Sequence, residues 1–397
     1  MRVAYVCMDR GVPVFGRKGC SIHVQEVIRA LRAKGAGIEL FAATLGDDRP
    51  PDLEPISIHQ MPVSCDPDRD VRERAALAAN RGLRLALQQS GPFDLVYERY
   101  SLWSFAGMEY AQASGVPGVL EVNAPLIEEQ SQYRGLIDRA SADRVAEQVF
   151  GDSAVLIAVS EEVAGYLEGH LAARGRVHVV PNGVNPARFA QGVPATYPAA
   201  PGTFTVGFVG TLRPWHGVPV LVEAFAMLHR RHPNTRLLVV GDGKERATLE
   251  ATVSEYGLRE VVHLTGQVAP GEVPGLLASM DVAVAPYPKL EHFYFSPMKV
   301  YDYMAAGLPV VTSRIGQLAK LIEDGVNGLL CTPGDAVDLA AALERLRLDP
   351  DLRVRLGRTA RATVLSDHTW DAVVQRILCL AGLDLQPQRD RVEAITR

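Results

Sequence analysis

The sequence predicts an α/β protein that contains two doubly wound, parallel-sheet domains. Short apolar runs alternate with amphipathic segments along nearly the whole chain, and a Pro- and Gly-rich stretch at 190–202 interrupts this alternation. The chain has 397 residues, which is too long for one ordinary hydrophobic core. Strands that alternate with helices form parallel sheets covered on both faces. We therefore expect domains at 1–189 and 203–369, joined by the linker 190–202.

The first domain is predicted from apolar runs that turn residues separate. Residues such as Val24, Ile28 and Leu31 recur at helical spacing and predict an amphipathic helix. The turn Pro181-Asn182-Gly183-Val184 ends this half of the chain. The expected strands lie at 2–8, 37–43, 93–97, 118–122, 154–159 and 176–180, and the expected helices at 22–34, at 71–89 and after Ser160.

The alternation restarts after the predicted linker and gives the second domain. The expected strands lie at 205–209, 235–240, 261–265 and 282–285, with one more from Val310. The expected helices lie at 218–229, 245–256, 273–278, 335–347 and 352–365, with one more after Ser296. The C-terminal segment 370–397 begins with a helical pattern, and we expect this helix to pack back on the first domain.

Composition and charge exclude several classes of protein. Hydrophobic residues make up 47% of the chain, and 41 basic against 46 acidic residues give a net charge of −5. A nucleic-acid partner would favour a basic protein, so none is expected, whereas peripheral contact of a local basic patch with a membrane stays open. Five scattered cysteines suit neither zinc nor a disulfide framework and predict a reducing, cytoplasmic location. We identify no leader peptide or spanning segment.

The segment 296–310 carries the strongest functional signal. Ser296 suits a helix N-cap, and Pro297 suits the first helical position. Free N–H groups at a helix N-terminus beside Lys299 would bind an anion such as phosphate. Asp302, about one turn further along, could accept hydrogen bonds from sugar hydroxyls. The alternative interpretation is a well-capped surface helix.

Three other glycine-containing segments follow expected strands. The segment 16–23 contains Gly16 and Gly19 before a helix, and its lone histidine, His23, is interpreted as structural. In the segment 207–217, Arg213 stands where a guanidinium could bind a diphosphate. The segment 241–244 lacks the spacing of a P-loop. The alternatives are a mobile loop, a surface arginine and a plain turn.

Together these segments resemble family 4 of the retaining glycosyltransferases, also called glycosyl transferases group 1. The resemblance covers nearly the whole chain and depends on the order of the segments 16–19, 158–161, 181–184, 207–217, 239–243 and 296–311. It implies the GT-B fold, in which two Rossmann-like domains face a central cleft. It also implies acceptor binding by the first domain and nucleotide-sugar binding, for instance of a UDP-sugar, by the second.

The resemblance implies a donor site in which Arg213 holds the diphosphate. His216 stands where the family usually has a lysine, so Lys299 is expected to supply that charge. The family's paired glutamates fall on Tyr294 and Asp302, and Asp302 is expected to bind the donor ribose. The donor-binding residues implied are Gly19, Arg213, His216, Gly266, Gln267, Val268, Phe295, Ser296, Pro297, Met298, Lys299 and Asp302.

In the first domain, Asn123 occupies the place of a histidine that many relatives carry near the reacting carbon. An amide can form hydrogen bonds there but cannot act as a base. Glu121 is expected to be a base, an acceptor clamp or a structural partner. Glu98 and Arg99 are expected to contact the acceptor or to form a packed ion pair. The implied catalytic residues are Arg213, Lys299, Asn123 and Glu121, and the implied acceptor residues are Glu98, Arg99, Glu121 and Asn123.

The implied reaction is a metal-independent, same-face attack of an acceptor hydroxyl, with the leaving diphosphate stabilised by Arg213 and Lys299. No metal or other cofactor is expected, and the acidic loop at 66–70 is interpreted as solvated. An epimerase-like enzyme acting on a nucleotide sugar and a non-catalytic glycan-binding protein are the alternatives. Small-molecule, lipid-linked and glycan acceptors all stay open, as do a monomer and a homodimer.

Overall fold

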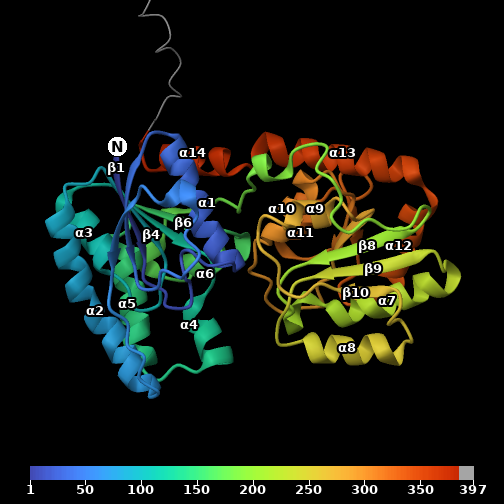
Figure 1. Cartoon of the computed structure of the whole chain (residues 1–397). Coiled ribbons are helices and arrows are strands. Elements are labelled where there is room, and N and C mark those ends of the chain that lie inside the picture. The colour runs from blue at the N-terminus through green and yellow to red at the C-terminus, as the bar shows by residue number, and fades with distance from the viewer. Residues whose placement is uncertain (384–397) are drawn as a thin grey trace, which may run out of the picture. The chain divides into compact units, whose positions relative to one another are not determined.

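The computed structural model of the chain describes residues 1–383 and divides into two compact units (Figure 1). Unit 1 comprises Met1–Pro181 together with the segment that starts at Trp370, and unit 2 comprises Asn182–Thr369. The expected packing of residues 384–397 lies outside the described residues.

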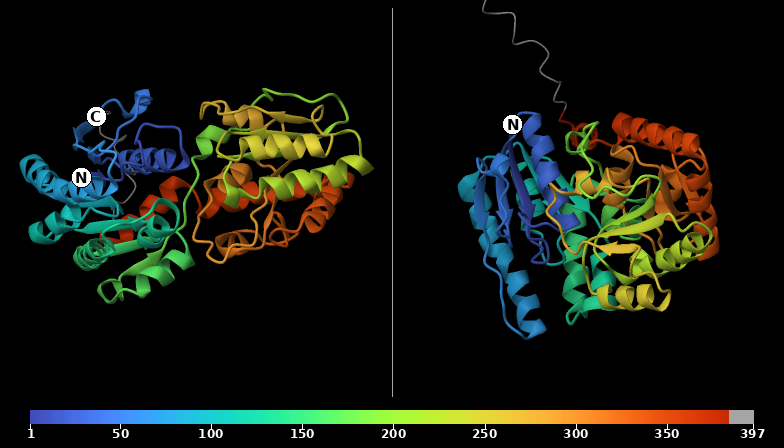
Figure 2. Two further views of the ribbon diagram at one scale, coloured as in Figure 1. Left: turned by 90° about the horizontal axis from the view of Figure 1, so that it is seen from below. Right: turned by 45° about the vertical axis from the view of Figure 1, so that its right-hand side comes forward.

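Unit 1 contains a parallel sheet of seven strands in the order β3-β2-β1-β4-β5-β6-β7. The order reverses beside β1, so helices cover both faces: α1 packs with α14, and α2 packs with α3 (Figures 1 and 2). The strands are β1 Arg2–Cys7, β2 Gly37–Ala42, β3 Ser57–Gln60, β4 Leu95–Arg99, β5 Gly118–Val122, β6 Val155–Ala158 and β7 Val177–Val179. The α-helices are α1 Gly19–Ala33, α2 Arg69–Ser90, α3 Ala106–Ser114, α4 Leu126–Glu129, α5 Arg139–Asp152, α6 Glu161–Glu168 and α14 Trp370–Leu380.

Unit 2 contains a second parallel sheet, of six strands in the order β10-β9-β8-β11-β12-β13. The strands are β8 Phe204–Val209, β9 Thr235–Val240, β10 Val262–Leu264, β11 Val282–Ala285, β12 Val310–Ser313 and β13 Leu329–Cys331. The α-helices are α7 Val218–Arg231, α8 Arg246–Glu255, α9 Val273–Leu277, α10 Met298–Ala305, α11 Gly316–Leu321, α12 Ala336–Leu348 and α13 Pro350–Asp367. Two doubly wound parallel sheets confirm the predicted fold class.

The boundary between the units differs from the one expected. It falls at Pro181, before the Pro- and Gly-rich stretch at 190–202. That stretch belongs to unit 2, where the N–H of Thr196 donates to the carbonyl of Gly275 and that of Tyr197 to Ser279 Oγ, both at 3.0 Å. Its backbone therefore forms hydrogen bonds around α9, which composition alone does not reveal.

Helix α14 belongs to unit 1, where it packs on α1. The rings of Trp370 and His23 lie 4.9 Å apart, and Lys34 forms a 2.8 Å ion pair with Asp371. The buried indole anchors the helix through its apolar area, whereas the ion pair at the surface contributes little.

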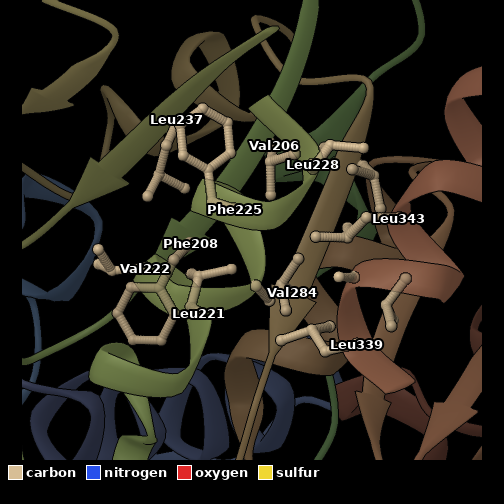
Figure 3. Packing of buried hydrophobic residues seen from close by; sticks show 14 of the residues in the cluster. Val206, Phe208, Leu221, Val222, Phe225, Leu228, Leu237, Val284, Leu339 and Leu343 are labelled. Carbon is tan, nitrogen blue, oxygen red and sulfur yellow. The ribbon is translucent and has the colours of Figure 1, made fainter. Parts of the chain in front are cut away.

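Unit 2 has a hydrophobic core on each face of its sheet because successive side chains of a strand point to opposite faces. Phe208 and Val284 belong to the core beneath α7 and α12, which Figure 3 shows. Val240 and Ala285 belong to the other core, which packs against α10. The two cores fix the strand ends and the start of α10, from which the candidate site is built.

We predict that Leu343→Ala destabilises unit 2. The Leu343 side chain is completely buried between α12 and the sheet, so its removal leaves a cavity and should cost about 2–5 kcal/mol. Leu348→Ala is the matched control, because this leucine of the same helix is 62% exposed and its loss should cost less than about 0.5 kcal/mol. Urea unfolding followed by circular dichroism measures both, and equal losses would contradict the packing described.

Candidate functional site

The ammonium group of Lys299 lies buried beneath the loop that follows β8. Its Nζ is 4.3 Å from the ring centroid of Phe208 and 5.7 Å from that of Tyr287. A Cβ added at Gly210 would lie 2.7 Å from Nζ, so a larger residue there would displace the ammonium. No hydrogen-bond partner to this Nζ is present among residues 1–383. Within residues 1–383, the ammonium is therefore stabilised by its cation–π contacts with these two rings and by no hydrogen bond.

Burial changes the protonation of this lysine. Because the charged form is desolvated, the pKa of Lys299 falls to about 7. An anion that bound close to Nζ would favour the charged form and raise that pKa again. Lys299 is thus a cation whose full charge depends on a ligand.

His216 lies on the same loop and is neutral near pH 7. Burial, then the charge of Lys299 and more weakly that of Arg213, lowers its pKa to about 3, although a hydrogen bond to Thr211 opposes the shift. Since the Thr211 carbonyl can only accept, the proton resides on Nδ1 of His216. The histidine therefore supplies no positive charge at this position near pH 7.

Arg213 completes the loop and connects it to the segment before α10. The residue precedes the 3₁₀ turn η5 (Pro214–His216), and its guanidinium carbon lies 5.7 Å from the ring centroid of Trp215. The Trp215 ring in turn stacks on Phe295, with centroids 6.3 Å apart and planes 12° apart. Two segments that the sequence separates by about 80 residues thus form one surface of unit 2.

The loop before α10 is held by the turn that ends the first half of the sequence. The backbone N–H of Asn182 donates to Ser296 Oγ at 3.0 Å, and its Nδ2 donates to the Ser296 carbonyl at 2.8 Å. Ser296 was expected to cap the helix, but Pro297 holds the N-cap position and α10 begins at Met298. The Ser296 hydroxyl is engaged by Asn182 and does not serve as the N-cap.

The other expected donor residues lie in different surroundings. Asp302 on α10 is 3.8 Å from a guanidinium nitrogen of Arg188. This neighbour has no signal in the sequence, because only tertiary packing brings the two residues together. Gly266 forms an isolated bridge with Gly241 at the end of β9, and Gln267 and Val268 follow it. Gly19 is the first residue of α1 and belongs to unit 1.

Glu121 of β5 is the centre of a buried polar network in unit 1. Its carboxylate accepts hydrogen bonds from Tyr97 and from Asn123 Nδ2, the latter at 2.8 Å. His23 Nε2 lies 2.5 Å and Arg99 Nη1 3.8 Å from the same carboxylate. Burial alone would raise the pKa of Glu121, but the neighbouring charges and hydrogen bonds lower it to about 2. A carboxylate this acidic is a weak base, and it fixes the orientation of Asn123.

Glu98 and Arg99 are also buried in unit 1 and engaged there. The hydroxyl of Ser104 donates to Glu98 at 2.5 Å, and burial raises the pKa of Glu98 to about 7. Arg99 faces Glu121. Both positions therefore fit the alternative of internal packing better than direct acceptor contact. The role of His23 beside Glu121 could not be foreseen, because no spacing in the sequence connects residues 98 positions apart.

A cavity of about 340 Å³ opens in unit 1 at the carboxyl ends of its strands. It is lined by residues that follow β1, β2, β3 and β4 and by one face of α2. This edge of a doubly wound sheet is where ligands usually bind. None of the expected acceptor residues lines the cavity.

Residues 1–383 contain neither a cluster of possible metal ligands nor a membrane-spanning helix. No group of three or more histidine, cysteine, aspartate or glutamate side chains could hold a metal ion. Within the same residues, every helix is too short or too polar to cross a membrane.

Family models match both halves of the chain. The model described as Glycosyltransferase Family 4 matches residues 17–188, and that of Glycosyl transferases group 1 matches residues 194–363. The chain is 26% identical to D-inositol 3-phosphate glycosyltransferase of Pseudarthrobacter chlorophenolicus, over 86% of this chain and 85% of the relative. It is 29% identical to glycogen synthase of Mycobacterium tuberculosis, over 73% and 69% of the two chains.

Solved structures share the fold. Sucrose-phosphate synthase of Thermosynechococcus elongatus superposes with a TM-score of 0.74 at 22% identity, covering 96% of this chain and 98% of that one. Anabaena HepE in complex with UDP-glucose gives 0.72 at 20% identity, covering 96% and 99%. These similarities confirm the GT-B fold. With family models matched along both halves, the chain belongs to the family 4 glycosyltransferases and is a hexosyltransferase-type enzyme.

Proposed function

We propose that this enzyme moves a hexose from a UDP-sugar to an acceptor hydroxyl with retention of configuration and without a metal ion. The observation that carries the proposal is the buried Lys299 ammonium of α10, which lacks a hydrogen-bond partner among residues 1–383 and lies over Phe208, close enough to His216 to lower its pKa. UDP as the leaving group agrees with the HepE structures, which are complexes with UDP and with UDP-glucose.

The chemistry follows from where charge develops. Cleavage of the bond between sugar and phosphate leaves negative charge on the diphosphate, which Arg213 and Lys299 stabilise. Two protein cations perform the electrostatic task that a metal ion has in other transferases. The acceptor hydroxyl attacks the face that the diphosphate leaves and passes its proton to the departing oxygen. This path retains the anomeric configuration and needs no protein base.

Asn123 takes part as a hydrogen-bonding group. Its Nδ2 is bound to the Glu121 carboxylate, so its Oδ1 faces away from that carboxylate and remains an acceptor. An amide oxygen of fixed orientation suits a sugar hydroxyl or the developing positive charge on the anomeric carbon. Glu121 is on this view a positioning residue, consistent with the pKa of about 2 that its surroundings impose.

The location proposed is the cytoplasm. All five cysteines of the described chain are free thiols, as a reducing compartment requires.

The proposed reaction is tested by product analysis. We expect UDP release from UDP-glucose, or from another UDP-hexose, to depend on an added acceptor and to continue in excess EDTA. Proton NMR of the new anomeric centre should show the configuration of the donor. An inverted product would refute retention, EDTA inhibition reversed by Mg²⁺ would refute metal independence, and acceptor-independent conversion would point to an epimerase.

Replacement of Lys299 should weaken donor binding. Lys299→Met keeps the apolar stem over Phe208 but removes the charge, so UDP affinity at pH 7 should fall by at least about tenfold, the lower range for losing a charge-assisted contact. Lys320→Met, at an exposed position on α11, is the control and should bind UDP like the wild type. Isothermal titration calorimetry measures both, and an unchanged affinity for the Lys299 variant would remove the basis of the proposal.

Donor binding should also take up protons at mildly alkaline pH. With a pKa of about 7, Lys299 is mostly neutral at pH 8 in the free enzyme, and a bound diphosphate raises that pKa and restores the charge. The affinity for UDP should therefore fall as the pH rises through 7.5 to 9, where the terminal phosphate of UDP is already ionised. Calorimetry in buffers of different ionisation enthalpy measures the uptake. Equal uptake by Lys299→Met would assign the proton to another group.

A further inference from the structure

The lining of the cavity in unit 1 contains more arginines than carboxylates. Four arginines line it, and two of them have partners: Arg134 pairs with Glu129 at 2.8 Å, and Arg72 donates to the carbonyls of the loop before α2. For Arg10 and Arg69, the described chain contains no hydrogen bond or ion pair of the side chain. Arg69 is half-buried, and its guanidinium crosses Gly135 so closely that a Cβ there would collide with it.

The carboxylates of the lining are already engaged. Glu73 is buried and accepts hydrogen bonds from the backbone N–H groups of Ile137 and Asp138, the shortest at 2.9 Å. Asp9 accepts from the N–H of Gly11 at 2.7 Å. Glu129 is paired to Arg134, and no acid of the lining forms an ion pair with Arg69 or Arg10. A ligand in this cavity therefore meets guanidinium groups that favour an anion.

Part of the cavity lining is apolar. Ala75, Ala76 and Ala79 present the small side chains of α2, and Leu102 and Trp103 follow β4. Alanine at these positions leaves the space that larger residues would fill. These apolar side chains favour a ligand with a hydrocarbon or aromatic part, because binding removes the apolar surface of that part from water.

The neutral polar side chains of the lining are used within the protein. Asn80 donates to the carbonyls of Leu77 and Trp103, and its amide oxygen accepts from the start of α3. The Ser104 hydroxyl donates to Glu98, and that of Ser101 to the carbonyl of Arg99. A bare saccharide needs many hydrogen-bond partners, and this lining offers few.

We propose that this cavity binds the acceptor and that the acceptor is an amphipathic anion. Its phosphate or carboxylate lies against Arg69 and Arg10, and its apolar body lies on the alanine face of α2 beside Trp103. The inference rests on the proposed glycosyl transfer and narrows its acceptor from three open classes to one. It also replaces Glu98 and Arg99 as the expected acceptor contacts. These two residues do not line the cavity, but they accept hydrogen bonds from Ser104 and Ser101, which do.

Binding of small probes to the full chain tests the proposal. Hexyl phosphate unites both features, and we expect it to bind at least about tenfold more tightly than inorganic phosphate, glucose 6-phosphate or neutral hexyl glucoside. Calorimetry without a donor measures this order. Equal affinity for hexyl glucoside would overturn the anionic part of the proposal, and equal affinity for glucose 6-phosphate would overturn the apolar part.

Variants locate the binding. Arg69→Met should weaken hexyl phosphate at least about tenfold, whereas Arg81→Met, at an exposed position of α2 outside the lining, should not. Ala76→Leu should reduce binding by filling the cavity. Both cavity variants should keep the wild-type circular dichroism and urea-unfolding transition, which shows that unit 1 is folded, and they should bind UDP in unit 2 like the wild type. Hexyl phosphate binding that is unchanged in Arg69→Met and Ala76→Leu would place it elsewhere and overturn the inference.

The outcome also separates this inference from the proposed function. If UDP release depends on neutral acceptors and is insensitive to Arg69→Met, the enzyme is a glycosyltransferase with a different acceptor site, and only this inference fails. If hexyl phosphate binds as expected but no acceptor promotes UDP release, the proposed transfer itself fails.

Discussion

One buried cation constrains the geometry of unit 2. Desolvation of the Lys299 ammonium disfavours its charged form, and the faces of Phe208 and Tyr287 compensate only in part. The group keeps its place because α10 and β8 are fixed by hydrophobic cores on both faces of the sheet. Gly210 contributes to the same arrangement, since a Cβ there would displace the ammonium. The desolvated ammonium destabilises the free protein, and a bound anion would compensate its charge. Such local destabilisation is typical of a binding site.

Unit 1 shows the opposite electrostatic arrangement. Glu121 is a buried carboxylate surrounded by His23, Arg99, Tyr97 and Asn123, so its charge is compensated without any ligand. Such a group changes little when a substrate binds, and its effect is to keep its neighbours in one orientation. On this argument Lys299 changes its protonation when an anion binds, whereas Glu121 keeps its charge and orients its neighbours. It also explains why Glu121 is a poor candidate for a base despite standing at the end of a central strand.

The sequence predicted what depends on local pattern and missed what depends on packing. Apolar runs revealed the central strands, whereas β3 (Ser57–Gln60), an edge strand with a single apolar residue, carries no such signal. The positions of Arg213 after a strand and of Lys299 at the start of a helix were predictable, because both follow from the order of the elements along the chain. The Arg188–Asp302 and His23–Glu121 pairs had no signal, since only the tertiary fold brings their members together. Composition predicted a linker at 190–202, but hydrogen bonds to neighbouring segments, which composition does not encode, join that stretch to unit 2.

The histidine at position 216 is explained by the lysine beside it. Like charges close to each other are disfavoured, and the charge of Lys299 acts on His216, so the two groups cannot both hold a proton easily. The lower intrinsic pKa of imidazole means that His216 is the one to lose its charge, and the charge of Lys299 is among the causes that lower its pKa. A permanent cation at 216 would instead repel Lys299 and lower its pKa further. A neutral imidazole therefore lets the loop keep one responsive cation, Lys299, beside one permanent cation, Arg213.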